Sequence, residues 1–503
     1  MLRDIRNLAR LIAIARVLAD HGVIVALVER EILPRWALWL GRGRAAEGRL
    51  GERMARAAEA LGPSFVKLGQ ALSTRADLIG ETEAGDLARL RDRLPPFPTA
   101  QAMAAIAREL GEPVESLFQS FDATPVAAAS IAQVHFAVTS DGQPVAVKVL
   151  RPGIEKAFAR DLDLLLWLAR LVERLIPKWR RLRPVESVAT LADIVTMEMD
   201  LRMEGAAADE LGANFAGDSD FRVPKVDWRR TARRVLTTER VEGIPIHLRE
   251  QLIAAGHDPH AVLERAARAT FAQVFRDGFF HGDPHPGNLF VDSAGAVWVV
   301  DFGIMGRLDQ DSRRFLAEML QGFLTRDYAR VAEVHFRAGF VPADKSLGAF
   351  TQACRSIAEP ILDRPANEIS IGRLLGQLFQ ITETFGMHTQ PHLLLLQKVL
   401  VVAEGVGRQL DPTVNMWQLA LPLVEDWMAE ALGPAARTRE AARTMAELGQ
   451  SLPRLIVGAE RALRRLAERP EERRESAWRA IGPGLVVAAA IGLLVLGWLF
   501  GRS

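Results

Sequence analysis

Cysteine is almost absent from this chain of 503 residues, because Cys354 is the only one. A single cysteine cannot form an intramolecular disulfide or a multi-thiolate metal site, which fits a reducing compartment. An excess of charge of either sign is also lacking, since 63 Lys and Arg residues stand against 62 Asp and Glu residues. The chain therefore lacks the overall charge typical of nucleic-acid-binding proteins, and nucleic acid is not an expected partner.

Internal repeats and long low-complexity linkers are absent from the sequence as well. With 49% hydrophobic and 25% charged residues, the composition excludes a wholly disordered chain. The length is enough for about three domains, or for one large catalytic domain with helical extensions.

A long uncharged hydrophobic run lies near the C-terminus, between Arg479 and Arg502. A helix over 480–501 would be about 30 Å long, enough to cross a bilayer, and we predict one transmembrane helix there. Arginines are frequent before this run and only Arg502 follows it, which keeps the large N-terminal part in the cytoplasm. The preceding segment, 416–479, is predicted to be helical and basic, and to favour anionic lipids. A buried hydrophobic hairpin is the alternative interpretation of the run.

The N-terminal segment 7–28 is also apolar, but Arg10, Arg16 and Asp20 interrupt it too often for a signal peptide or a membrane span. An amphipathic helix remains, which either lies on a membrane surface or packs on the protein. Apolar residues recur at helical spacing through 1–115, so we predict a helical N-terminal extension.

Two β-hairpins are predicted in the middle of the chain. Their strands are apolar, β-branched runs at 131–138 with 144–150, and at 288–292 with 297–300. An Asp141-Gly142 turn separates the first pair. Helical patterns cover 161–176, 188–214 and the chain beyond about 309, and a further strand is predicted at 234–239.

Three short motifs carry the chemistry. Val145-Ala-Val-Lys148 places a lysine on a strand, as in the V-A-I-K motif whose ammonium group reaches the α/β-phosphates of ATP. In His281-Gly-Asp-Pro-His-Pro-Gly-Asn288, Asp283 and Asn288 stand five residues apart, the offset found in the kinase catalytic loop. Asp301-Phe-Gly follows thirteen residues later, and the second hairpin returns it beside the loop. Asn288 and Asp301 can therefore share the Mg²⁺ that bridges the nucleotide phosphates.

The histidines of this loop leave alternatives open. We interpret His281 as a brace for the loop rather than a metal ligand. His285, two residues after Asp283, either contacts a phosphate or caps backbone groups. A His/Asp/His zinc site is a sharper hypothesis, but it leaves Lys148 and the Asp301 motif unexplained.

Further motifs resemble the signatures of a known family. These are Lys67-Leu-Gly-Gln70, the run Ala127, Ala128, Ala129, Ser130, and Glu198-Met-Asp200. They match the KxGQ signature, the alanine-rich nucleotide loop and the ExD signature of the UbiB family of atypical kinases, which the chain resembles from about 50 to 415. The helix expected near 393–410, with Gln397-Lys398, is also similar to the family, although a buried core helix accounts for it.

The resemblance implies an α+β, protein-kinase-like fold with two lobes. Its parts are a helical extension over 1–115, an N-lobe over 116–243 and a C-lobe over 244–415, followed by the basic segment and the membrane helix. Glu204 then matches the acid that pairs with Lys148, and Glu239 and Val241 stand where a hinge offers backbone groups to adenine.

The family pattern also implies a regulatory role for the N-terminal unit. Lys67 would pair with Glu198, with Gln70 and Asp200 beside them, and the unit would lie where a protein substrate otherwise docks. Alanines in place of glycines restrict positive φ and hold Cβ atoms near the phosphates, so the handling of ATP and ADP should be altered.

We therefore predict an ATP/Mg²⁺-dependent kinase or ATPase that supports ubiquinone biosynthesis at the cytoplasmic membrane. Asp283 would position or deprotonate the acceptor. The expected partners are anionic lipids, polyprenyl-phenol or quinone intermediates and other quinone-biosynthesis enzymes, rather than protein substrates. Two alternatives stay open: a small-molecule phosphotransferase, because the loop 281–288 also resembles that of aminoglycoside and choline kinases, and a nucleotide-bound scaffold without turnover.

Overall fold

The computed structural model of the chain describes most of residues 2–411. The described ranges are 2–30, 35–40, 47–73, 79–87, 95–175, 184–360 and 391–411, with additions at 90, 362, 377, 380–382, 384–387, 414, 422–423 and 427. Residues Met1–Val424 form one compact unit and Glu425–Ser503 a second. The membrane helix predicted over 480–501 lies outside the described residues, as does nearly all of the basic segment 416–479.

All secondary-structure elements that the structure describes before residue 118 are helices, as the sequence predicts. Its elements are α1 Leu2–Asp20, α2 Val23–Glu29, η1 Arg35–Leu40, α3 Leu50–Leu61, α4 Pro63–Ser73, α6 Glu81–Leu87, α7 Thr99–Leu110 and α8 Val114–Leu117. Among the helices that the structure describes, none alone could cross a bilayer. The segments Arg6–Asp20 and Val23–Glu29 together have the length and apolarity, but the chain bends by 79° between them.

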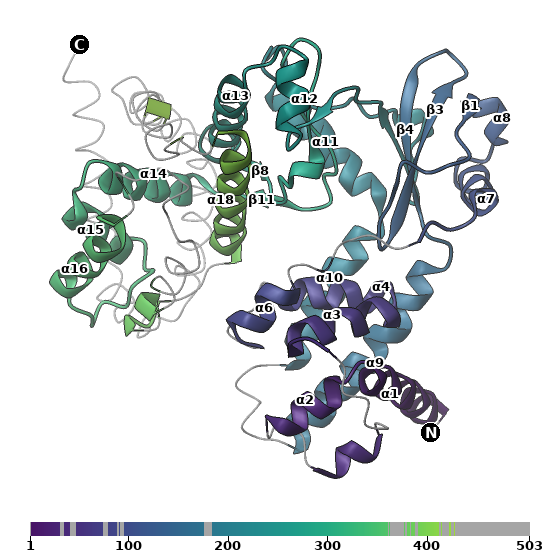
Figure 1. Cartoon of the computed structure of the whole chain (residues 1–503), viewed down its shortest axis with the longest axis horizontal. Helices are drawn as coiled ribbons and strands as arrows, with labels where there is room; N and C mark the ends of the chain where they lie inside the picture. The colour runs from purple at the N-terminus through teal and green to yellow at the C-terminus, as the bar shows by residue number, and fades with distance from the viewer. Residues whose placement is uncertain are drawn as a thin grey trace, which may run out of the picture. The chain divides into compact units, whose positions relative to one another are not determined.

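The first helix packs on the protein. Figure 1 shows α1 beside α9 (Ile154–Leu175), and Arg10 Nε lies 3.0 Å from the buried Asp161 Oδ1 of that helix. The sequence left open whether this helix lies on a membrane surface or packs on the protein, and this contact corresponds to packing on the protein. Leu8 and Ile12 remain exposed on α1, and a role for them at a membrane stays a prediction.

The first sheet is antiparallel and has the strand order β1-β3-β4-β6, with β2 paired to β3. Its strands are β1 Phe118–Phe121, β2 Ala127–Ala128, β3 Ala132–Thr139, β4 Pro144–Leu150 and β6 Val235–Glu239. The predicted first hairpin is thus confirmed as β3 and β4. Gly142, in the turn of this hairpin, has a φ of 84°, a value that glycine adopts without strain. Val145, Val147 and Val149 alternate along β4 and are buried in a core shared with α7.

Between β4 and β6 the chain forms α9, α10 (Pro184–Glu198) and α11 (Leu201–Asn214). The prediction of one helical segment over 188–214 is wrong in one respect, because the helix is interrupted at Met199 and Asp200. Asp200 caps α11, since its carboxylate accepts a hydrogen bond from the backbone N–H of Arg202. An N-cap side chain satisfies a first-turn N–H group that has no partner within the helix, so Asp200 marks the start of a separate helix.

The chain between residues 221 and 307 carries two small sheets. One has the order β5-β10-β9-β7 and the other pairs β8 with β11. Their strands are β5 Phe221–Arg222, β7 Ile244–Pro245, β8 Phe279–His281, β9 Leu289–Val291, β10 Val297–Val299 and β11 Met305–Arg307. The predicted second hairpin is confirmed as β9 and β10, which pair antiparallel. The β8–β11 pair was not predicted, because the loop 282–288 and the β9–β10 hairpin stand between its two strands, so no turn signal links them.

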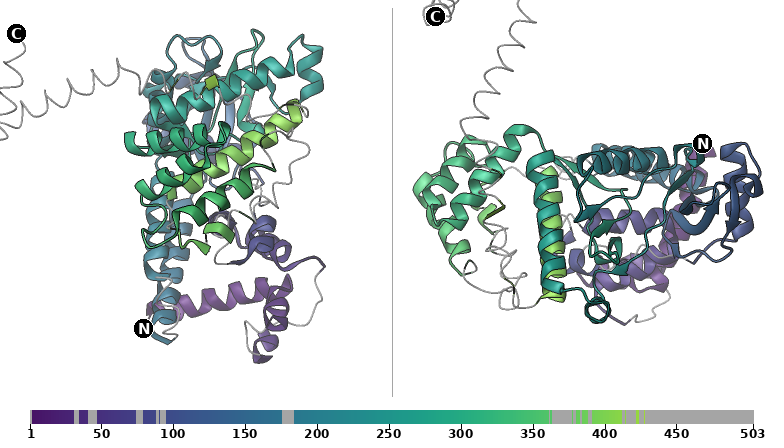
Figure 2. Two further views of the ribbon diagram at one scale, coloured as in Figure 1. Left: turned by 90° about the vertical axis from the view of Figure 1, so that its left-hand side faces the viewer. Right: turned by 90° about the horizontal axis from the view of Figure 1, so that it is seen from above.

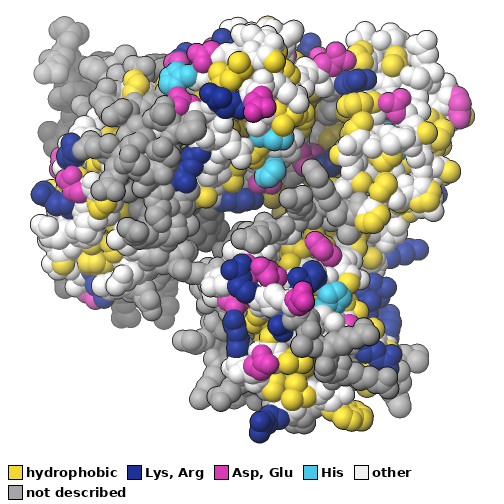
Figure 3. Space-filling view, viewed as in Figure 1, with side chains coloured by type: hydrophobic (Ala, Val, Ile, Leu, Met, Phe, Trp, Pro, Cys, Tyr) yellow, Lys and Arg dark blue, Asp and Glu magenta, His cyan; other side chains and the backbone are white. Residues whose placement is uncertain are grey.

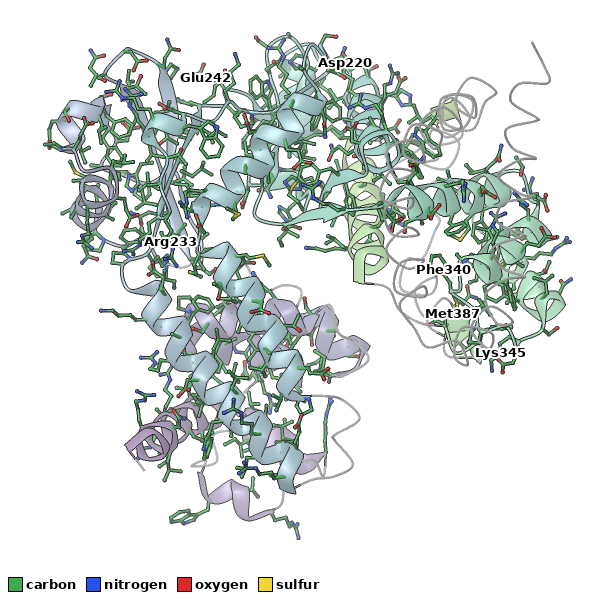
Figure 4. All side chains as sticks on the ribbon, turned by 180° about the vertical axis from the view of Figure 1, so that it is seen from behind. Asp220, Arg233, Glu242, Phe340, Lys345 and Met387 are labelled. Atoms are coloured by element: carbon green, nitrogen blue, oxygen red, sulfur yellow. The ribbon has the colours of Figure 1, made fainter. Side chains whose placement is uncertain are left out.

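Helices surround these sheets. They are α12 Arg249–Ala254, α13 Pro259–Phe271, η4 Ala272–Asp277, α14 Gln310–Leu324, α15 Tyr328–Arg337, α16 Leu347–Ala358 and α18 Pro391–Leu410, and the short turns are η3 Trp228–Arg230 and η5 Pro286–Asn288. Figure 2 shows α18 alongside α13, and Val406 and Leu410 of α18 belong to the same buried core as Val262 of α13. Phe340 packs with Met387 in a separate small core near Lys345 (Figure 4).

Charged side chains are mixed over the described surface. On the face in Figure 3, Lys and Arg side chains are interspersed with Asp and Glu, as their nearly equal numbers lead one to expect.

Candidate active site

Three charged side chains meet beside β4. Lys148 Nζ lies 2.7 Å from Glu204 Oε1 and 2.9 Å from Asp301 Oδ1. The alternation of β4 turns Lys148 to the face opposite the buried Val147 and Val149, and Glu204 stands in the first turn of α11. The structure thus brings together three residues that the sequence placed on three separate motifs.

The electrostatics of this triad favour the charged forms of Lys148 and Asp301. Burial alone would lower the pKa of Lys148, but the negative charges of Asp301 and Glu204 outweigh it and raise that pKa above its usual value. The charge of Lys148 in turn holds the pKa of Asp301 well below its ordinary range. Burial raises the pKa of Glu204, although Lys148 opposes the shift.

Asp301 has an unusual backbone. Its φ is 66°, and among the described residues other than glycine only Arg326 shares a positive φ. Aspartate is one of the few residues that tolerate this region, which still costs about 1–3 kcal/mol and is concentrated at functional sites. The strained backbone is therefore consistent with selection for the position of this carboxylate.

His281 braces the loop, as the sequence interpretation has it. Its Nε2 donates to the Asp301 carbonyl over 2.8 Å, and its Nδ1 accepts the backbone N–H of Asp283 over 3.1 Å. Burial lowers the pKa of His281, in keeping with the neutral ring that these two bonds require. Both ring nitrogens are engaged with the protein, so this ring is not arranged as a zinc ligand. Within the described ranges, no group of three or more His, Cys, Asp or Glu residues could hold a metal ion.

The loop after His281 is ordered by its own side chains. His285 Nδ1 accepts the N–H of Gly287 over 3.0 Å, which is the capping role of the two that the sequence allowed. Asn288 Nδ2 donates to the Asp283 carbonyl over 3.2 Å, and the Val300 N–H donates to the Asn288 carbonyl over 2.9 Å.

Asn288 and Asp301 have the right chemistry for Mg²⁺. The backbone carbonyl of Asn288 accepts a hydrogen bond from Val300, the residue before Asp301, at the base of the β9–β10 hairpin. Because the amide nitrogen of Asn288 binds Asp283, its amide oxygen is the atom for a cation, and Asp301 supplies a carboxylate that is half exposed. Hard oxygen donors of this kind are the ligands that Mg²⁺ prefers, so the residues fit the ion.

The backbone of the alanine-rich loop is held by hydrogen bonds to β3 and to Arg151. Ala127 and Ala128 pair with β3, and the Ala129 N–H donates to the Ala132 carbonyl over 2.7 Å. The carbonyl of Ala129 accepts two hydrogen bonds from the guanidinium of Arg151, at 3.0 and 2.9 Å. Ser130 is fully buried. None of these four loop residues has a positive φ, as the alanine content leads one to expect.

Replacing Ala129 by glycine should raise the affinity for ATP roughly threefold, because the freed backbone can turn its N–H groups toward phosphates. Equilibrium binding of ATP and ADP to the wild type and the variant measures this. Ala128→Gly serves as a comparison within β2. Unchanged affinities for both nucleotides in Ala129→Gly would show that the alanines do not govern nucleotide handling.

The expected hinge joins the first sheet to the second. Glu239 ends β6, and its N–H donates to the Lys225 carbonyl over 2.8 Å. Val241 follows in the linker to β7, next to Glu242, which Figure 4 labels. The structure places both residues between the sheets, and their contact with adenine stays a prediction.

Lys67 and Glu198 meet as the family pattern implies, with Lys67 Nζ 3.1 Å from Glu198 Oε2. Both side chains are largely buried, and the pair joins α4 to the end of α10. Asp200 then caps α11, the helix that carries Glu204. Gln70 lies one turn beyond Lys67 on α4, where its carbonyl accepts the Ser73 hydroxyl over 2.7 Å. The N-terminal helices are thus connected to the start of α11, and a regulatory effect remains a prediction.

Lys398 is a site residue to which the sequence assigned no role. Its Nζ lies 3.0 Å from Asp283 Oδ1, although α18 is more than a hundred residues further along the chain. The sequence drew attention to this lysine in two ways, by its place in a mostly apolar helix and by the similarity of Gln397-Lys398 to the family, but neither placed it at Asp283.

Comparison with known proteins agrees with this geometry. Residues 89–335 match the ABC1 atypical kinase-like domain, and residues 354–415 match the UbiB helical domain. The "Probable protein kinase UbiB" of Marinobacter nauticus is 41% identical over 460 residues, covering 88% of this chain and 84% of that protein. The protein of the same name from Pseudomonas aeruginosa strain PAO1 is 40% identical, with 96% and 94% covered.

A solved structure is similar as well. It is that of Rv3197 from Mycobacterium tuberculosis in complex with erythromycin, with a TM-score of 0.52 and 26% identity over 73% of this chain and 94% of that one. The mixed helix-and-sheet architecture described above is therefore kinase-like.

Proposed function

This chain belongs to the UbiB family of atypical kinases, which act in ubiquinone biosynthesis, and we propose that it couples ATP and Mg²⁺ use to polyprenyl-phenol intermediates at a membrane. The observation that carries this proposal is the contact of Lys148 with both Glu204 and Asp301. A lysine oriented by a glutamate beside a carboxylate suited to Mg²⁺ is the arrangement that phosphoryl transfer from ATP needs.

Each residue then has one task. Lys148, held by Glu204, binds the α/β-phosphates, and it leaves Asp301 when the nucleotide enters. Asp301 and Asn288 would hold Mg²⁺, which would neutralise charge on the phosphate oxygens. His281 fixes the backbones of Asp283 and Asp301 relative to each other, because its ring is hydrogen-bonded to both.

Asp283 receives the proton of the acceptor. An oxygen of water, of a small hydroxyl compound or of an isoprenoid-linked lipid forms a bond to the γ-phosphorus, and the bond from that phosphorus to the bridging β-γ oxygen breaks. The acceptor proton passes to the Asp283 carboxylate, and ADP leaves with the electron pair of the broken bond. With water as acceptor the products are ADP and phosphate, and turnover would drive extraction or presentation of the lipid.

The experiment is Mg²⁺-dependent phosphate release by the purified full-length protein, with and without anionic-lipid vesicles and a phenolic quinone precursor. We expect release that both additions stimulate. A stoichiometric phosphorylated alcohol in place of free phosphate would favour the small-molecule phosphotransferase. Nucleotide binding without any turnover would favour the scaffold.

We further propose that the chain is anchored in the cytoplasmic membrane by one helix over 480–501, with the catalytic part in the cytoplasm. The support is the uncharged run between Arg479 and Arg502. Deleting 480–503 should move the protein from the membrane fraction to the soluble fraction, with wild-type protein fractionated in parallel. Retention of the truncated chain on membranes would transfer the attachment to α1.

A further inference from the structure

The helix α18 lies directly against the loop that carries Asp283. Lys398 Nζ is 3.0 Å from Asp283 Oδ1, and Leu395, three residues earlier on α18, faces the preceding Gly282. A Cβ on Gly282 would stand 2.8 Å from Ile304 Cγ2 and 3.1 Å from Leu395 Cδ1, so this glycine is packed between the Asp-Phe-Gly segment and α18. The contact between Lys398 and Asp283 is therefore part of a packed interface and not a chance meeting of two long side chains.

The position of α18 is fixed by the core around it. Val406 and Leu410 are buried with Phe302, the middle residue of the Asp-Phe-Gly motif. At the end of the helix, Arg249 Nε donates to the Leu410 carbonyl over 2.9 Å, and His260 Nδ1 lies 3.0 Å from Asp411 Oδ2. About three turns before this anchored end, the side chain of Lys398 contacts Asp283.

The loop 281–288 contains no lysine or arginine of its own. The residue two positions after Asp283 is His285, whose Nδ1 is taken by the Gly287 N–H. Lys148 is engaged with Glu204 and Asp301. Transfer of a phosphoryl group needs cationic donors at the group that moves, as well as at the phosphates that stay behind.

Lys398 has the properties of such a donor. Its side chain and that of Asp283 are each 37% exposed, so the pair is open to a ligand. Half-exposed ion pairs contribute little to stability, so stability alone gives no reason to hold a lysine against this aspartate. A lysine also offers three N–H donors, enough to bind a carboxylate and a phosphate oxygen together.

We infer that Lys398 binds the γ-phosphoryl group of ATP, with Asp283 on its other side, so that the helical domain supplies a catalytic residue to the kinase-like domain. Lys398 stays protonated throughout, and it donates hydrogen bonds to the oxygens of the group in transfer while Asp283 takes the acceptor proton. This inference rests on the proposed function, since it requires that the site binds ATP.

The test uses the full-length protein with Lys398→Ala, Lys398→Arg and, as a matched lysine control, Lys345→Ala. Binding of Mg²⁺-ADP and of a non-hydrolysable Mg²⁺-ATP analogue is measured together with ATP turnover. We expect Lys398→Ala to bind ADP as the wild type does, to bind the ATP analogue about tenfold more weakly and to lose at least about tenfold in kcat. Lys398→Arg should recover part of kcat, and Lys345→Ala should behave as the wild type.

The outcomes separate this inference from the proposed function. Equal weakening of ADP and analogue binding in Lys398→Ala, or a lower melting temperature with unchanged kcat, would give Lys398 a structural role and overturn the inference alone. Wild-type protein that neither binds nor turns over ATP would overturn both. A double variant with Asp283→Asn should lose little more kcat than Asp283→Asn does alone, because the two residues act on one phosphoryl group. Fully additive losses would contradict their joint action.

Discussion

Replacing Asp301 by asparagine should lower Mg²⁺-dependent phosphate release by at least about 100-fold while leaving the fold intact. The substitution removes the only anionic ligand that we assign to Mg²⁺ and leaves the neutral Asn288 amide. Lys148 keeps Glu204 as its partner, so the local charge is still balanced. Phosphate release over a range of Mg²⁺ concentrations, together with the melting temperature, measures both expectations.

The backbone gives a reason to choose asparagine for this experiment. At a φ of 66°, asparagine is tolerated as well as aspartate, whereas alanine would add strain. The Asp301 carbonyl, which accepts from His281, is unchanged by the substitution. Asp311→Asn on α14 is the matched control, because its carboxylate is 76% exposed. Release by Asp301→Asn within threefold of the wild type would remove Asp301 from the metal site.

The sequence predicts those parts of the site that lie within short stretches of chain. The V-A-V-K strand, the loop 281–288 and the Asp301 motif each depend on local spacing, and the hairpin between the last two brings Asn288 toward Asp301. The strands of both hairpins were predicted within one or two residues, because in each hairpin two apolar runs stand on either side of a short turn segment. The strands β8 and β11 lack this signal, because the loop 282–288 and the β9–β10 hairpin separate them in the sequence.

Other features have only a weak local signal in the sequence or depend on packing between distant segments, which the residue types do not reveal. The break between α10 and α11 arises because Asp200 caps a new helix, and an aspartate before Leu201 was its only local signal. Lys398 reaches Asp283 because Val406 and Leu410 fix α18 in a core with Phe302, a contact that no spacing rule contains. The pairing of Lys67 with Glu198 could be expected only from the family resemblance.

Replacing Lys148 by methionine is expected to abolish nucleotide turnover, with a loss of at least about 100-fold, and to change how stability depends on pH. Methionine fills a similar volume but leaves Glu204 and Asp301 without their shared cation. Burial already raises the pKa of Glu204 with Lys148 present, and without Lys148 that pKa must rise further. Glu204 should then take up a proton near neutral pH. Melting temperatures between pH 5 and pH 8 report the change.

The sign of this pH dependence follows from proton binding. Glu204 in the folded variant holds its proton to a higher pH than a glutamate in the unfolded chain, whose pKa is about 4.3. The stability of Lys148→Met is therefore greatest at low pH and falls as the pH rises through the raised pKa, by about 1–3 kcal/mol where Glu204 must ionise in a buried site. Adding Glu204→Gln should remove the dependence, because glutamine does not titrate. A melting temperature of Lys148→Met that follows the wild type at every pH would mean that the charge of Lys148 is not what balances the two carboxylates.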